Sequence, residues 1–175
     1  MLAYEKVGNM LAICLLAIGI LSRLIIHVDN FTPVIALALF GGVYLKKKQA
    51  ILLPIMLFAA TDIILGFHRT MFFTWSSVLL IVIMGFAVKK NKNWATVLGG
   101  GLVSAILFYI ITNFGVWMMT GMYPLTLTGL AECYVVAIPY FRSSLLSTLI
   151  YGFIFFGGYE VIAAQVRNTR LSHVL

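Results

Sequence analysis

Charged side chains are scarce in this sequence, and acidic side chains are the scarcest. Only 10% of the 175 residues are charged, and five residues are Asp or Glu. About a quarter of the residues of a soluble domain are charged and about half are apolar, whereas 62% of this sequence is hydrophobic. The composition excludes an ordinary soluble domain and predicts an all-α membrane protein that crosses the bilayer several times.

Cysteines and catalytic motifs are also few. Cys14 and Cys133 lie far apart in apolar sequence and form no CxxC pair, which argues against a disulfide framework. No Walker motif, nucleophile elbow or Ser/His spacing is present, so we predict no catalytic residue and no cofactor. A metal site is a weaker alternative, because His27, Asp29 and His68 suit nickel, cobalt or zinc but lack HxxH or HExxH spacing.

The basic residues are concentrated in two clusters between apolar runs. These are Lys46-Lys47-Lys48 and Lys89-Lys90-Asn91-Lys92. Basic residues in short loops stay on the cytoplasmic side of a membrane, so both clusters are expected there. The net charge of +7 is therefore attributed to inner loops and the tail, and not to nucleic-acid binding. Glu160, near the inner end of the last run, is expected to reach the interface or pair with a nearby lysine.

Six apolar runs are interpreted as transmembrane helices of a single domain, residues 1–175. A span needs about 20 residues, and the second run is short. The first run lacks a convincing cleavage site, so we expect a retained helix and not a signal peptide. Both termini are expected on the cytoplasmic side of a bacterial inner membrane. The expected spans are 7–27, 31–45, 49–66, 71–88, 94–112 and 143–164.

The stretch between the last two spans is harder to interpret. Gly115, Gly121 and Pro124 make a continuous helix after position 113 unexpected. The apolar part, 125–138, has the length of a re-entrant or interfacial segment, and Glu132 near its middle would be costly against lipid. We therefore favour six spans with a short outer segment, and keep a seventh span as the alternative.

This topology places most of the unusual polar and aromatic residues at the outer ends of the helices. Such an asymmetry indicates an outward-facing site for a small molecule, although loops are often simply polar. Aromatic rings would stack on the ligand, and amide or imidazole groups would form hydrogen bonds with it. The candidate binding residues are Asn30, Phe31, His68, Asn113, Trp117, Tyr123 and Glu132.

Two ionisable residues are predicted below the outer surface. Arg23 lies one turn before the end of the first span, and Asp62 lies one turn before Gly66. At 1.5 Å per residue both sit at a similar depth, roughly 6 Å below their helix ends. An unpaired charge there is costly, so we predict a structural ion pair between the first and third spans.

The first span also carries small residues on one face. Gly8, Ala12 and Gly19 could allow another helix to approach closely, because small-xxx-small patterns bring backbones together. Such patterns are common, so a partner helix on this face is a hypothesis with a purely structural alternative.

Several strings between positions 30 and 142 together resemble an uncharacterised family of small bacterial membrane proteins that carry the label of transport proteins. The resemblance covers most of this region but implies no substrate. The matching strings are Asn30-Phe-Thr-Pro33, Ala38-Leu-Phe-Gly-Gly42, Asp62-Ile-Ile-Leu-Gly-Phe-His68, Thr112-Asn-Phe-Gly-Val-Trp117, Gly121-Met-Tyr-Pro124, Cys133-Tyr and Ala137-Ile-Pro-Tyr-Phe-Arg142.

At the level of the fold, the chain looks like the substrate-binding (S) component of an energy-coupling-factor vitamin transporter. This resemblance implies six helices, cytoplasmic termini and an outward pocket. It also implies a transmembrane coupling subunit and separate ATPases as partners. S components typically dock that subunit through Ala-xxx-Ala in the first helix, from which Gly8-xxx-Ala12 departs slightly.

The leading hypothesis is therefore a substrate-binding subunit of an importer for a vitamin-like small molecule, embedded in the lipid bilayer. One alternative is a scaffold subunit of a larger membrane complex. A second alternative is a membrane enzyme that uses His27, His68 and Glu132 as acid–base groups.

Overall fold

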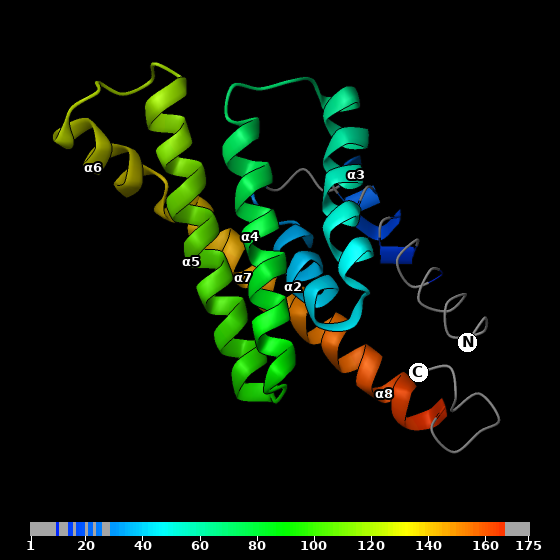
Figure 1. Ribbon diagram of the computed structural model, residues 1–175. Helices are drawn as coiled ribbons and strands as arrows, with labels where there is room; N and C mark the ends of the chain where they lie inside the picture. The colour runs from blue at the N-terminus through cyan, green and yellow to red at the C-terminus, as the bar shows by residue number, and fades with distance from the viewer. Residues whose placement is uncertain are drawn as a thin grey trace.

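All regular secondary structure in the described part of the chain is helical (Figure 1). The computed structural model describes residues 29–166 without a break, and residues 10, 14, 15, 17–19, 21, 22, 24 and 25 before them. The helices are α2 (Val34–Tyr44), α3 (Lys47–Leu65), α4 (Met71–Lys90), α5 (Trp94–Met119), α6 (Leu127–Val136), α7 (Ile138–Gly152) and α8 (Gly158–Val166), with the π-helical turn η1 (Phe153–Gly157) joining the last two.

Four helices in the described residues are long and apolar enough to cross a membrane. They are α3, α4, α5 and the continuous helix of α7, η1 and α8, counted from Ile138 to Ala164. These correspond to the last four of the six predicted spans. The first predicted span lies largely outside the described residues. The structure therefore shows a helical protein with four helices of spanning length, and the count of six spans stays a prediction.

The second predicted span is a much shorter helix than its apolar run indicated. Helix α2 has 11 residues, about 16 Å at 1.5 Å per residue, whereas the hydrocarbon core is about 30 Å thick. Every residue from Val34 to Val43 is buried. A helix that is apolar on all sides is buried on all sides, and here the protein itself supplies the surroundings.

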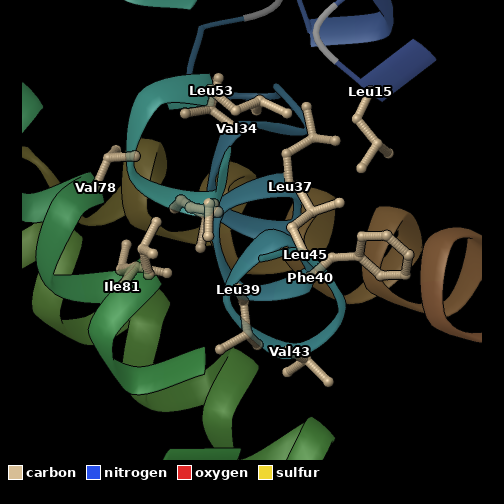
Figure 2. Close-up of a cluster of buried hydrophobic side chains, with 14 of the residues drawn as sticks. Leu15, Val34, Leu37, Leu39, Phe40, Val43, Leu45, Leu53, Val78 and Ile81 are labelled. Atoms are coloured by element: carbon tan, nitrogen blue, oxygen red, sulfur yellow. The ribbon is translucent and has the colours of Figure 1, made fainter. Parts of the chain in front are cut away.

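Helix α2 is the centre of the hydrophobic core. Figure 2 shows Leu37, Phe40 and Val43 of α2 among side chains from neighbouring segments, including Leu15 and Ile81. Helices α3, α4, α5 and α7 all contact α2. The longer helices thus have an inward face on α2 and an outward face with many exposed apolar side chains, as expected of helices that meet lipid.

Helices α2 to α5 run in alternating directions, so their connections gather at two ends (Figure 1). One end, called the lysine end, holds the clusters at 46–48 and 89–92. There Glu160 Oε1 accepts hydrogen bonds from Lys92 Nζ and from the Tyr44 hydroxyl, each at 2.6 Å. The predicted pairing of Glu160 with a nearby lysine is confirmed. The other end, called the distal end, holds residues 29–33, 66–70 and 120–126.

The helix after Asn113 continues further than predicted. Helix α5 runs to Met119, and its 26 residues begin with a capping box in which Asn93 and Thr96 exchange hydrogen bonds. The predicted fifth span, 94–112, ends too early, because Gly115 fits inside the helix against Phe73. The predicted break in the helix after position 113 is present, at residues 120–126. The chain turns later, at Gly121, whose positive φ of 72° favours glycine.

The short outer segment is helix α6, which has ten residues and is too short to span a bilayer. This agrees with a short segment and not with a seventh span. Helix α6 lies against the distal part of α5 and contacts α7 only at its end (Figure 1). Thr126 caps its N-terminus by accepting a hydrogen bond from the Gly129 N–H.

Candidate functional site

A cavity of about 630 Å³ opens at the distal end. Its walls come from the segment before α2, from α3 and α4 with their connection, from α5, and from the segment between α5 and α7. The lining residues are Asp29, Asn30, Thr32, Val34, Phe58, His68, Thr70, Thr74, Phe108, Thr112, Asn113, Val116, Met122, Tyr123, Cys133, Val136, Ala137 and Tyr140. Segments that are far apart in sequence thus meet around one space.

Four of the seven predicted binding residues line this cavity: Asn30, His68, Asn113 and Tyr123. Asn30 has a positive φ of 57°, a conformation that asparagine tolerates better than most residues. His68 is exposed, and its Nδ1 lies 2.9 Å from Thr70 Oγ1, so the imidazole is oriented by a second lining residue. Each of these side chains can donate or accept hydrogen bonds.

The other three predicted residues are not among those that line the cavity. Phe31 packs its ring against Tyr151 at a centroid distance of 6.0 Å. The Trp117 indole donates a hydrogen bond to the Pro124 carbonyl oxygen at 3.0 Å, which holds the 120–126 turn against α5. Glu132 is exposed on α6. The predicted stacking of Trp117 on a ligand stays a prediction, since the hydrogen bond engages the indole N–H and not the face of the ring.

The wall that α6 provides is attached to α5 by several hydrogen bonds. The Tyr134 hydroxyl donates to the Ile110 carbonyl at 2.7 Å, and the Tyr109 hydroxyl donates to the Tyr134 carbonyl. The Cys133 thiol lies 3.4 Å from the Asn113 carbonyl oxygen. These contacts place Cys133 against α5, and burial raises the pKa of its thiol, so the thiol is neutral near pH 7.

Sequence reasoning missed the threonines and the apolar floor of the cavity. Phe108, Thr112 and Val116 recur every four residues and present one face of α5 to the cavity. Starting from Asn113, this spacing could have been found in the sequence. Phe58 could not, because nothing local distinguishes it from other buried aromatic residues of the core.

The predicted ion pair has one partner outside the described residues, namely Arg23. The other partner, Asp62, is fully buried and accepts a hydrogen bond from the Trp75 indole at 3.0 Å. Sequence reasoning did not identify Trp75 in this role.

The predicted docking stripe is described only at Gly19, because Gly8 and Ala12 lie outside the described residues. Gly19 is buried, and a Cβ added there would come within 2.2 Å of Leu57 Cδ1 and 3.0 Å of Leu37 Cδ1. The position that a side chain would occupy at Gly19 is therefore filled by leucines of the protein's own α2 and α3. The expectation that Gly19 is open to a partner helix is wrong.

The metal alternative depended on His27, which is outside the described residues. Within the part of the chain that the structure describes, no three His, Cys, Asp or Glu side chains are grouped so that they could hold a metal ion.

The fold and its cavity define a class: an all-helical, multi-pass membrane protein with one enclosed core helix and a cavity at one end. More particularly, the chain belongs to DUF6580, a family of unknown function, whose model matches residues 4–171. No curated protein and no solved structure matches the chain.

Proposed function

We propose that this protein is a substrate-binding membrane subunit that captures a small molecule in the distal cavity. The observation that supports this function is the cavity itself. Its volume of about 630 Å³ lies within the roughly 300–1,000 Å³ typical of small-molecule sites. Its lining combines an apolar floor with a few polar groups, which is the usual composition of such sites.

The direction of capture follows from the lysine clusters. If the lysine end faces the cytoplasm, as the positive-inside rule requires, the cavity opens to the outside of a bacterial inner membrane. A molecule could then reach Asn30, His68 and Tyr123 without crossing lipid. The absence of a phosphate-binding motif in the sequence leaves the energy for import to separate ATPases and a transmembrane coupling subunit.

Docking of such a subunit is not supported at Gly19, which is buried. We therefore place any coupling contact elsewhere on the outer surfaces of the long helices, which carry exposed apolar side chains such as Ile83, Leu102 and Ile106.

The direct test is mass spectrometry of small molecules extracted from the purified protein. A compound retained by the native protein should be reduced in Asn113→Ala and His68→Ala, because both side chains line the cavity. Asn91→Ala is the matched control, since Asn91 is an exposed asparagine at the lysine end. Unfolding temperatures should be compared first, because the Asn113 amide also donates to the Tyr109 carbonyl.

Equal retention in Asn113→Ala, His68→Ala and Asn91→Ala would contradict binding in the cavity. Conversion of the extracted compound by the purified protein alone would instead indicate an enzyme. Copurification of one stoichiometric protein partner with no small molecule would favour a scaffold.

A further inference from the structure

Among the described residues, the lining of the distal cavity contains an aspartate but no lysine or arginine. Asp29 is the single formally charged side chain in the lining. The two described arginines at this end, Arg69 and Arg142, are not among the lining residues. Arg69 Nη1 points instead to the Met119 carbonyl oxygen, 3.5 Å away at the end of α5. A carboxylate therefore lines the space, and the basic side chain that lines it with Asp29 is the imidazole of His68, not a lysine or an arginine.

A second carboxylate, that of Glu132, lies on the α6 side of the cavity. Glu132 lies on α6 next to Cys133, and it contributes to the raised pKa of Tyr123, after burial and the Cys133 thiol. Tyr123 lines the cavity. Two of the five acidic residues of the chain are thus Asp29 in the lining and Glu132 next to the lining residue Cys133.

Aromatic rings supply the remaining walls. Phe58, Phe108, Tyr123 and Tyr140 all line the cavity. The face of an aromatic ring carries partial negative charge and attracts cations within about 6 Å. A site with a carboxylate in its lining and aromatic walls favours a positively charged nitrogen attached to an apolar body over an anion.

We propose that the distal cavity takes a small organic cation, with its charged nitrogen near Asp29 and its apolar part between the aromatic walls. This inference rests on the proposed function of the cavity as a ligand site. It narrows the substrate class to protonated amines and quaternary or heteroaromatic cations, and it predicts weaker binding of carboxylates, phosphates and sulfonates.

Cys133 provides a reporter inside the cavity. In a Cys14→Ser variant it is the only cysteine, so methanethiosulfonate reagents with a trimethylammonium, a sulfonate or a neutral methyl group report access by charge. Rates are normalised to those with free cysteine. The cationic reagent should react faster than the anionic one, and Asp29→Asn should lower this ratio by at least about fivefold, the effect of one charge at close range in a largely aqueous mouth.

Glu160→Gln is the control for charge, because Glu160 lies at the lysine end and should leave the ratio unchanged. A ligand test uses two matched aromatic compounds, benzyltrimethylammonium and benzenesulfonate. The ammonium compound should slow the reaction of Cys133 with the neutral reagent, and the sulfonate should not.

Three results would each overturn the cation proposal and still leave an accessible cavity. These are a faster reaction of the anionic reagent, an unchanged ratio of cationic to anionic rate in Asp29→Asn, and protection by the ammonium compound that is no better than protection by the sulfonate. A different result would overturn both proposals. If neither Cys133 nor a Val116→Cys replacement reacts with any reagent, the cavity is closed to solvent and cannot capture a ligand from it.

Discussion

Gly42 of α2 and Gly85 of α4 meet backbone to backbone. A Cβ added to Gly42 would lie 2.3 Å from the Val82 carbonyl oxygen and 2.8 Å from Gly85 Cα. A Cβ added to Gly85 would lie 2.6 Å from the Leu39 carbonyl oxygen and 2.7 Å from Gly42 Cα. The absence of both side chains lets the two helices approach closely, as small residues do in membrane helix pairs.

The first prediction concerns this contact. Gly42→Ala and Gly85→Ala should each destabilise the protein by about 1–3 kcal/mol, because the new methyl group meets backbone that can only move with its helix. Chemical unfolding in detergent micelles would measure the loss. Gly99→Ala is the matched control, since nothing lies within 4 Å of its Cβ position, and it should be neutral or slightly stabilising. Equal effects at all three glycines would contradict the tight crossing.

The second prediction concerns the buried carboxylate of Asp62. The Trp75 indole donates to Asp62 Oδ2 at 3.0 Å and stacks on Phe58. Trp75→Phe keeps an aromatic ring but removes the donor, so the free energy of unfolding should fall by about 1–3 kcal/mol. Trp94→Phe is the control, because Trp94 is 47% exposed, and its effect should stay within about 0.5 kcal/mol. A Trp75→Phe protein as stable as the control would refute the role of this hydrogen bond.

The third prediction concerns the pH dependence of Cys133. Burial raises the pKa of its thiol in the folded state, so the folded protein holds this proton more tightly than the unfolded chain does. The contribution to stability is constant below the ordinary thiol pKa of about 8.5 and falls as the pH rises above it. In the Cys14→Ser protein, the midpoint of the iodoacetamide rate against pH should lie above that of the unfolded chain. A midpoint at or below the unfolded value would contradict burial of the thiol.

The fourth prediction concerns orientation. Asn91 and Met122 are exposed at opposite ends of the bundle. In a cysteine-free background, Met122→Cys should react with a membrane-impermeant maleimide in intact cells, and Asn91→Cys should react only after permeabilisation, because the lysine clusters stay in the cytoplasm. The reverse pattern would place the cavity on the cytoplasmic side and remove the basis for capture from outside.

Hydropathy alone located α3, α4, α5 and the long helix of α7 and α8, because the transfer free energy of an apolar run adds up residue by residue whatever surrounds it. For the same reason it could not distinguish α2 from a spanning helix. The run from Val34 to Val43 is equally apolar whether lipid or protein covers it, and only the packing of four neighbouring helices shows that protein does.

For the candidate binding residues too, the sequence indicated some features and the tertiary structure decided others. Asn30, His68 and Asn113 were found from the sequence because alternating helices bring every second connection to the same end. Whether each side chain faces the cavity was decided by tertiary contacts. Trp117 is turned to the Pro124 carbonyl by the return of the chain after α5, and Phe58 reaches the cavity floor from a helix whose local sequence shows only an apolar residue.

The sequence by itself therefore determined the class of protein, the approximate positions of its four long helices and the end at which its polar residues gather, since these depend on local composition and chain direction. The tertiary structure alone decided the cavity. Its volume and lining depend on the distances between α3, α4, α5 and the segment 122–140 around it, and on how α6 is held against α5. Those distances arise from contacts between segments that are far apart in the sequence, and such contacts cannot be read from local composition.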